Sequence, residues 1–263
     1  MDVASKQQKT LRNVLYYGLP VLAILMIAVG WVLFSDSRPE LMPAPADVWA
    51  RFVKTFTKPI AKTSLAGHAW ASLRRVLMAL LIAWAFGISF GILIGWNKKC
   101  KAFFGSIFEV IRPIPPIAWI PLVVVWMGIG LKAKALIIFF TAFVPCVINS
   151  YTGIKLTNKT LINVSRTFGA SNAEIFWKVG VPSSLPMVFA GIRVALGNSW
   201  STLVAAEMLA ASAGLGYMIQ IGRTVARPDI VIVGMVVIGA IGAILSGFLS
   251  RAEKYFLRWK VNR

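Results

Sequence analysis

The chain has 263 residues, of which 58% are apolar and only 14% charged, and its formal net charge is +19. A soluble domain carries about 25% charged residues, so the composition excludes an ordinary soluble protein and predicts an integral membrane protein. The lysines and arginines cluster at the ends of long uncharged runs instead of following one face, which argues against nucleic acid as a partner. The two cysteines, Cys100 and Cys146, are too few for a disulfide framework or a Cys-based metal site, and no metal site is expected.

Long uncharged runs predict the membrane spans. A spanning helix needs about 20 mostly apolar residues, because every backbone N–H and C=O in the hydrocarbon layer is bonded within the helix. The sequence therefore predicts an all-α, polytopic fold with six transmembrane helices, and an even number of spans places both termini on one side. The expected spans are Asn13–Phe34, Val76–Trp96, Pro113–Leu131, Ala135–Ile154, Val179–Ala206 and Ile230–Ser250.

Basic residues near the span ends predict the orientation. Short cytoplasmic loops are enriched in Lys and Arg, and the run Lys98–Lys101 and the C-terminal cluster both lie close to span ends. We therefore expect cytoplasmic N and C termini. The first apolar run is too long for a secretory signal and lacks a small-residue cleavage site, so it is expected to remain as a helix.

Three regions are expected along the chain. Residues 1–66 would hold the first transmembrane helix and an outer amphipathic helix, residues 67–251 a core domain, and residues 252–263 a basic cytoplasmic tail. The amphipathic helix lies either in the outer interface of the membrane or as a soluble helix packed on the spans. Its apolar stripe consists of Val48, Trp49, Phe52, Val53 and Phe56.

Two features lie inside the expected spans. Gly87, Gly91 and Gly95 follow one another at four-residue spacing, which lets another helix approach closely. Four prolines fall in the ten residues from Arg112 to Pro121, and no unbroken helix can run through them. Broken backbone at membrane depth is tolerated where it lines an aqueous cavity, so this segment is the first candidate for a solute pathway. The alternative is a kinked entry at the cytoplasmic interface.

Charged side chains in or next to the spans need partners, because an unpaired charge at this depth is costly. Glu109 and Arg112 are spaced to pair on one helix face. Glu207 is expected to meet Arg74 or Arg75, whereas Arg193 needs a carbonyl, a residue of another helix, a lipid phosphate or a passing anion. Structural pairing is favoured over contact with a solute for both.

No catalytic centre is expected. The single histidine, His68, has no nucleophile or metal ligand set nearby, so a packing role at the interface is expected. The chain also lacks the G-x-x-x-x-G-K-[ST] loop that would let it bind ATP itself. The protein is therefore not expected to be an enzyme.

The connection 155–181 carries the most specific pattern in the sequence. Gly169 permits a turn between two short helices, and Phe168, Ile175, Phe176 and Val179 form an apolar stripe that something must cover. The spacing of Gly169-Ala170, Phe176, Val179, Pro182 and Leu185-Pro186 resembles the cytoplasmic "EAA" loop of permease subunits of bacterial ABC importers. Asn163-Val164-Ser165 stands where that family has Glu-Ala-Ala.

Four further segments resemble the taurine, sulfonate and nitrate branch of these binding-protein-dependent transport permeases. The similarity runs in order from about His68 to Arg258. The segments are Arg112-Pro-Ile-Pro-Pro-Ile-Ala-Trp-Ile-Pro-Leu122, Trp126–Gly130, Trp200–Glu207 and Gly214–Tyr217.

The resemblance implies a type I ABC importer permease fold in the bacterial inner membrane. It implies a homodimer that encloses the translocation path among membrane lipids, two ATP-binding subunits that hold ATP and Mg, and an extracytoplasmic solute-binding protein. It also implies that the 157–179 loop couples to the ATPase. The expected coupling residues are Arg166, Phe168, Gly169, Ala170, Glu174, Phe176 and Pro182. The candidates for the path or gate are Arg112, Pro115, Pro116, Trp119, Arg193, Trp200, Ser201 and Glu207.

The resemblance favours a small anion as cargo. Taurine or an alkylsulfonate is expected first and nitrate or bicarbonate next; relatives that carry cyanate or pyrimidine precursors share much of the pattern. A secondary transporter or channel would usually show an inverted repeat and an intramembrane ion-binding set, and neither is found. A membrane scaffold would need no broken prolyl helix.

Overall fold

The computed structural model describes residues 2–128 and 130–259, and within them it is built of helices with no strand. Five helices are long and apolar enough to cross a membrane, and a sixth span results if one sharply bent pair of helices is counted together. The prediction of an all-α polytopic protein is confirmed. The helices that carry these spans are α1 (Asp2–Ser37), α3 (Leu65–Trp96), α6 (Leu131–Lys155), α9 (Val181–Ala210) and α11 (Pro228–Phe256).

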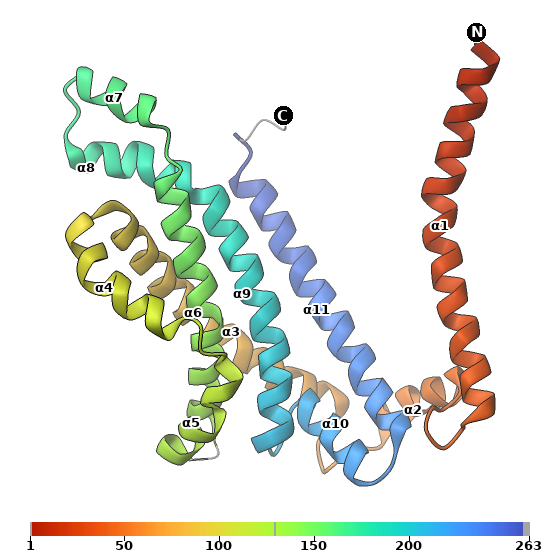
Figure 1. The fold of residues 1–263 in the computed structure, drawn as a ribbon. Coiled ribbons are helices and arrows are strands. Elements are labelled where there is room, and N and C mark those ends of the chain that lie inside the picture. The colour runs from red at the N-terminus through yellow and green to blue at the C-terminus, as the bar shows by residue number, and fades with distance from the viewer. Residues whose placement is uncertain (1, 129, 260–263) are drawn as a thin grey trace.

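The core is formed where α3, α6 and α9 pack side by side (Figure 1). The glycine stripe of α3 lies against α6: a Cβ on Gly91 would stand only 2.5 Å from the carbonyl oxygen of Val147. Gly87 and Gly95 meet Cys146 and Ile154 in the same way. Small residues therefore set the distance between these two helices, as the four-residue spacing predicts.

The expected span Pro113–Leu131 is broken, as its prolines predict, but its bounds are wrong. That stretch holds a 3₁₀ turn, Pro116–Trp119, and the eight-residue helix α5 (Ile120–Met127). Only together with the preceding α4 (Lys98–Ile111) does it reach the length of a span, and the two parts are bent by 82°. The prolines cause the break, because each removes a backbone donor and crowds the preceding turn. Lys98–Lys101, expected in a loop, begin α4.

The connection between α6 and α9 is a helical hairpin. It consists of α7 (Lys159–Thr167), a turn at Gly169 with φ of +80°, and α8 (Asn172–Ile175). A π turn, Phe176–Gly180, joins α8 to α9 without a loop between them. The two short helices around a glycine turn are as predicted.

The two ends of the molecule differ in what they contain. The start of α1, the α7–α8 hairpin and the end of α11 lie at one end (Figure 1). The other end carries α2 (Pro45–Thr57), α5 and α10 (Leu215–Thr224). This arrangement agrees with an even number of membrane crossings.

The first helix stands apart from the rest in Figure 1, and only 6% of its apolar window is buried. Near its end, the indole N–H of Trp31 donates a hydrogen bond of 3.0 Å to the carbonyl oxygen of Pro43, which ties it to the segment before α2. Helix α2 buries Val48 and Thr55 against the protein, whereas Trp49, Val53 and Phe56 are exposed.

Candidate functional site

The break between α4 and α5 forms one wall of a cavity of about 340 Å³. The opposite walls come from the middle of α6 and from α9. Four of the path candidates, Arg112, Pro115, Pro116 and Ser201, meet here. The remaining lining residues are Ile114, Ile117, Thr141, Val144, Pro145, Asn198 and Thr202.

Among the described residues that line this cavity, Arg112 is the only charged one. It caps the end of α4, where its backbone N–H donates to the carbonyl oxygen of Phe108 at 2.9 Å. The predicted pair with Glu109 is not among the ion pairs of the described residues, so that prediction is wrong. The guanidinium therefore keeps its five N–H donors for other partners.

Four uncharged polar side chains also line the cavity, beside its isoleucine, proline and valine residues. Asn198, Ser201 and Thr202 follow one side of α9, and Thr141 faces them from α6. The hydroxyls of Ser201 and Thr141 donate to backbone carbonyls one turn earlier, at 3.2 and 2.8 Å. A cation among hydroxyl and amide groups is suited to hold an anion. Asn198, Thr141 and Thr202 were missed from the sequence, because only the packing of α6 on α9 turns them toward Arg112.

The other path candidates lie outside this cavity. Trp119 stacks on Phe140 with ring centroids 5.6 Å apart. Trp200 is buried against α11, and its indole N–H donates to the carbonyl oxygen of Ile238 at 3.1 Å. Arg193 forms an ion pair with Glu253 of α11, so its partner comes from another helix.

Glu207 is fully buried, with 0% of its side chain exposed, in a cluster of polar groups between α3, α9 and α10. Arg75 donates to one carboxylate oxygen at 2.6 Å, which confirms the predicted partner, and also to the carbonyl oxygen of Ala213 at 2.6 Å. The hydroxyl of Ser72 lies 2.9 and 2.8 Å from the two carboxylate oxygens. The backbone N–H of Gly216 donates to the second oxygen at 3.0 Å.

His68 extends the same cluster and is also fully buried. Its Nδ1 accepts from the N–H of Gly214 at 3.1 Å, and its Nε2 lies 3.0 Å from the carbonyl oxygen of Ile60. Ser72 likewise accepts from the N–H of Leu215 at 2.9 Å. The three side chains of α3 thus fix the turn between α9 and α10. Their spacing at positions 68, 72 and 75, on one helix face, is the signal in the sequence that was missed.

The α7–α8 hairpin holds the residues expected to couple to an ATPase. Ser171 and Glu174 form a capping box at the start of α8: the Glu174 N–H donates to the Ser171 hydroxyl at 3.2 Å, and the Ser171 N–H donates to the carboxylate at 3.0 Å. Lys178 also pairs with Glu174 at 3.2 Å. The S-x-x-E pattern at 171–174 is the sequence signature of such a cap. Glu174 therefore stabilises the start of α8, in addition to its expected role in coupling to the ATPase.

The apolar stripe of the hairpin is covered only in part. Ile175 is buried, and Phe176 packs on Trp96 at the end of α3 with ring centroids 5.2 Å apart. Phe168, in contrast, is 86% exposed, and Trp177 is exposed as well. Arg166 is exposed as well, whereas Ala170 and Pro182 are partly buried. The hairpin thus presents an aromatic and basic tip beyond the body of the protein.

Nothing in the described part of the chain groups three or more His, Cys, Asp or Glu side chains into a set that could hold a metal ion.

Known proteins are similar to this chain in sequence and in fold. A family model for the binding-protein-dependent transport system inner membrane component matches residues 87–259. The taurine transport system permease protein of Escherichia coli is 36% identical over 92% of this chain and 89% of its own length. The nitrate import permease protein of Synechocystis is 30% identical over 89% and 87%, respectively.

A solved structure shows the same fold at lower sequence identity. The inward-facing MetNI methionine ABC transporter matches with a TM-score of 0.62 and 20% identity, over 71% of this chain and 93% of the matched chain. This likeness agrees with the type I importer fold. The chain belongs to the inner membrane component family of binding-protein-dependent transport systems, whose members are transport permeases and not enzymes.

Proposed function

We propose that this chain is the permease subunit of an ATP-driven importer that takes up a small anion, with taurine or an alkylsulfonate as first candidate and nitrate or bicarbonate next. The observation that carries the proposal is the exposed Arg112, without an ion pair among the described residues, which lines the cavity at the helix break. A charged solute that leaves water needs replacement partners, since an unpaired charge in a low-dielectric site is costly. The guanidinium supplies the charge, and the amide of Asn198 and the hydroxyl of Thr202 supply further donors, whereas the hydroxyls of Ser201 and Thr141 already donate to backbone carbonyls.

The position of the cavity supports a role in transport. Discontinuous helices in transporters commonly form the solute site, because their freed backbone groups are satisfied only where they line a cavity. A water molecule takes up about 30 Å³ in the liquid, so about 340 Å³ holds a small anion with some of its hydration. The partner copy of a homodimer would close the open side of this cavity and enclose one path between the two chains.

Orientation follows from the distribution of charge and from the fold. The start of α1, the end of α11 and the hairpin lie at one end of the molecule, and the basic clusters near the span ends favour that end as the cytoplasmic one. We place the N and C termini and residues 155–181 in the cytoplasm of a bacterial cell. The opposite end then faces the solute-binding protein.

The hairpin would transmit motion from the ATP-binding subunits. Exposed Phe168 and Trp177 offer an apolar surface that needs a partner, and two ATPase subunits that hold ATP and Mg would provide it. Because α8 continues through the π turn into α9 without a loop, a displacement of the hairpin is passed directly to α9. At 1.5 Å per residue, the start of α9 at Val181 lies about 30 Å along that helix from Ser201 in the cavity wall. ATP-driven closure thereby reshapes the solute site.

Uptake tests the anion site. Proteoliposomes with the chain, its ATPase subunits and its solute-binding protein are expected to lose most ATP-dependent uptake of labelled taurine when Arg112 is changed to Gln, while Arg112→Lys retains part of it. Arg258→Gln is the matched control, because it also removes a cation but lies near the C-terminal end of the chain and outside the cavity. It should leave uptake unchanged. Full uptake by Arg112→Gln would remove Arg112 from the path. Accumulation without ATP would instead point to a secondary transporter.

Assembly tests the coupling site. Gly169 adopts a φ of +80°, whereas proline is locked near −65°, so Gly169→Pro should distort the hairpin and abolish copurification with the ATPase. Gly197→Ala, at a glycine with open space around it, is the control. Normal complex yield with Gly169→Pro would exclude the hairpin as the coupling element.

A further inference from the structure

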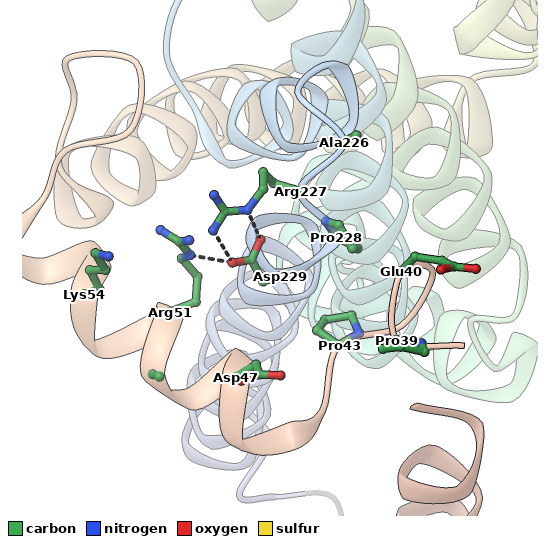
Figure 2. A pocket seen from close by; sticks show the side chains of 11 residues that line it. Pro39, Glu40, Pro43, Asp47, Arg51, Lys54, Ala226, Arg227, Pro228 and Asp229 are labelled. Carbon is green, nitrogen blue, oxygen red and sulfur yellow. Dashed lines mark hydrogen bonds and ion pairs between the residues drawn. The ribbon is translucent and has the colours of Figure 1, made fainter. Parts of the chain in front are cut away.

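A group of charged side chains at the end of the molecule opposite the hairpin is balanced in charge. It surrounds a cavity of about 660 Å³ between α2 and the turn before α11 (Figure 2). Asp229 pairs there with Arg51 at 2.6 Å and with Arg227 at 2.9 Å. The charged residues of the lining are three acids and three cations: Glu40, Asp47, Asp229, Arg51, Lys54 and Arg227. This group needs no counterion from outside.

Lys134, at the same end of the molecule, is a cation without such a partner. It lies near the start of α6, and only 5% of the residue is exposed. The ion pairs and side-chain hydrogen bonds of the described residues include none to its ammonium. A charge that leaves water without an acceptor is costly, and within membrane spans such charges usually face a partner or a solute path.

The carboxylate near Lys134 is already engaged by other donors. The charged groups that act on the ammonium are those of Arg75 and Glu207. The oxygens of Glu207 accept from the guanidinium of Arg75, from the hydroxyl of Ser72 and from the backbone N–H of Gly216. Two cations therefore stand against one carboxylate, and one positive charge in this group is uncompensated.

The start of α6 makes the surroundings more positive. The helix begins after Gly130, whose position carries no side-chain cap, and Lys134 lies at the end of the first turn. The N-terminus of a helix carries a partial positive charge, which favours an anion and disfavours a cation. The ammonium of Lys134 is therefore not explained by stabilisation of its own helix.

The position of Lys134 relates it to the cavity around Arg112. Thr141 lines that cavity, and Lys134 lies nearly two turns before it on the same face of α6, about 10 Å along the axis at 1.5 Å per residue. Ile138, which is fully buried, lies between them on that face. Nζ of Lys134 is not among the fully enclosed polar atoms that lack a hydrogen bond in the described residues, so the charged end keeps part of the small exposure of the residue.

We propose that Lys134 is an anion-binding residue of the translocation path, placed ahead of the cavity around Arg112 for a solute that enters from the end opposite the hairpin. The inference rests on the anion import and the orientation proposed above. An ammonium has three N–H donors and acts as a compact point charge, so it suits a small oxyanion such as a sulfonate, nitrate or bicarbonate. The apolar layer at Ile138 separates this first cation from Arg112, and the solute would pass from one to the other when the layer opens.

Uptake and stability measured on the same variants test the proposal. In proteoliposomes with the ATPase subunits and saturating solute-binding protein, Lys134→Met should lower the initial rate of ATP-dependent uptake of labelled taurine at least tenfold. Lys134→Arg keeps the charge and should retain part of the rate. The matched control is Lys132→Met, which removes an exposed cation two residues away and should leave uptake unchanged.

The Tm of the purified chain separates a role in the path from a role in the fold. Methionine has nearly the length of the lysine side chain, and Lys134→Met leaves Arg75 and Glu207 as a balanced pair. Replacing a buried ion by an apolar residue of similar volume is often neutral or stabilising. The Tm of Lys134→Met in detergent should therefore equal or exceed that of the wild type, although uptake falls.

Three outcomes overturn the inference. Normal uptake by Lys134→Met would remove the residue from the path, and an equal loss with Lys132→Met would assign the effect to general charge. Loss of uptake together with a lower Tm would give Lys134 a structural role instead. Absence of uptake by the wild type would refute the proposed function itself, and normal uptake by Arg112→Gln with loss in Lys134→Met would refute only the site at Arg112.

Discussion

The α9–α10 turn and the α7–α8 hairpin show opposite uses of side chains. At the turn, a carboxylate is fully buried, its guanidinium partner is partly buried, and every described polar partner is satisfied. At the hairpin, the charges are solvated while large aromatic side chains face water. Exposing Phe168 to water adds no stability to the chain. The comparison therefore indicates that the contacts of the turn are all made within this chain, whereas the hairpin needs a partner to cover its aromatic side chain.

This difference predicts that the turn contributes to the stability of the isolated chain and the hairpin to binding of a partner. Changes at the turn should alter the stability of the isolated chain, because its partners are all intramolecular. Changes at the tip of the hairpin should leave stability alone and alter binding. The following predictions test that division.

The largest effect is expected at Glu207. Glu207→Ala leaves the guanidinium of Arg75, which is only 13% exposed, without its ion-pair partner, and breaking a buried pair from one side costs about 3–5 kcal/mol. Thermal unfolding of the purified chain in detergent should show a large drop in Tm, and Glu207→Gln, which keeps the shape and one acceptor, a smaller one. Glu109→Ala, at an exposed acid without an ion pair, is the control. An unchanged Tm for Glu207→Ala would show that the cluster is not needed for the fold.

How far the sequence predicts this region depends on which contacts are local. The pairing of Glu207 with Arg75 follows from the cost of a buried charge and the supply of nearby cations. The roles of Ser72 and Gly216 do not, because they arise only when α10 folds back over the end of α9. The spacing of His68, Ser72 and Arg75 marks a polar face on an apolar helix, but the backbone groups it binds are set by tertiary structure.

The spans and the hairpin show the same limit. Hydropathy predicts five of the spans, and the glycine predicts the hairpin turn, since both depend on short stretches of chain. The span at the prolines was misplaced because its first half is α4, a helix whose basic start reads as a loop. The sequence leaves open what covers the apolar stripe of the hairpin, and the structure shows that Trp96, from a helix far away in sequence, packs on Phe176.

The second largest effect is expected at Gly91 in the core. A Cβ there would stand 2.5 Å from a backbone oxygen of α6 and 2.9 Å from the Cβ of Ser150, so Gly91→Ala forces α3 and α6 apart. Overpacking of this kind costs about 1–3 kcal/mol, measured again as a lower Tm. Gly239→Ala in α11 has nothing within 4 Å and should be neutral or stabilising. Equal Tm values for the two variants would contradict the close packing.

A smaller effect, on assembly only, is expected at Phe168. Because the side chain is 86% exposed, Phe168→Ala should change the unfolding free energy of the isolated chain by less than about 0.5 kcal/mol. Its Tm should therefore stay nearly the same. Loss of an aromatic anchor should weaken association with the ATPase about tenfold, or about 1.4 kcal/mol, in a titration of the detergent-solubilised subunits. Leu156→Ala, at another exposed apolar residue near the hairpin, is the control. A drop in Tm without a change in association would reverse the division between the two regions.

The smallest effect separates two interactions of one carboxylate. Ser171→Ala removes the hydroxyl that accepts from the N–H of Glu174, and loss of such a cap costs about 1 kcal/mol. Lys178→Ala removes only a solvent-exposed ion pair to the same Glu174, which contributes less because water screens it. Hydrogen exchange of the amides in α8 should therefore accelerate more in Ser171→Ala than in Lys178→Ala, with the rest of the chain unchanged. If the order were reversed, the start of α8 would be held by charge and not by its cap, and the hairpin would be sensitive to salt.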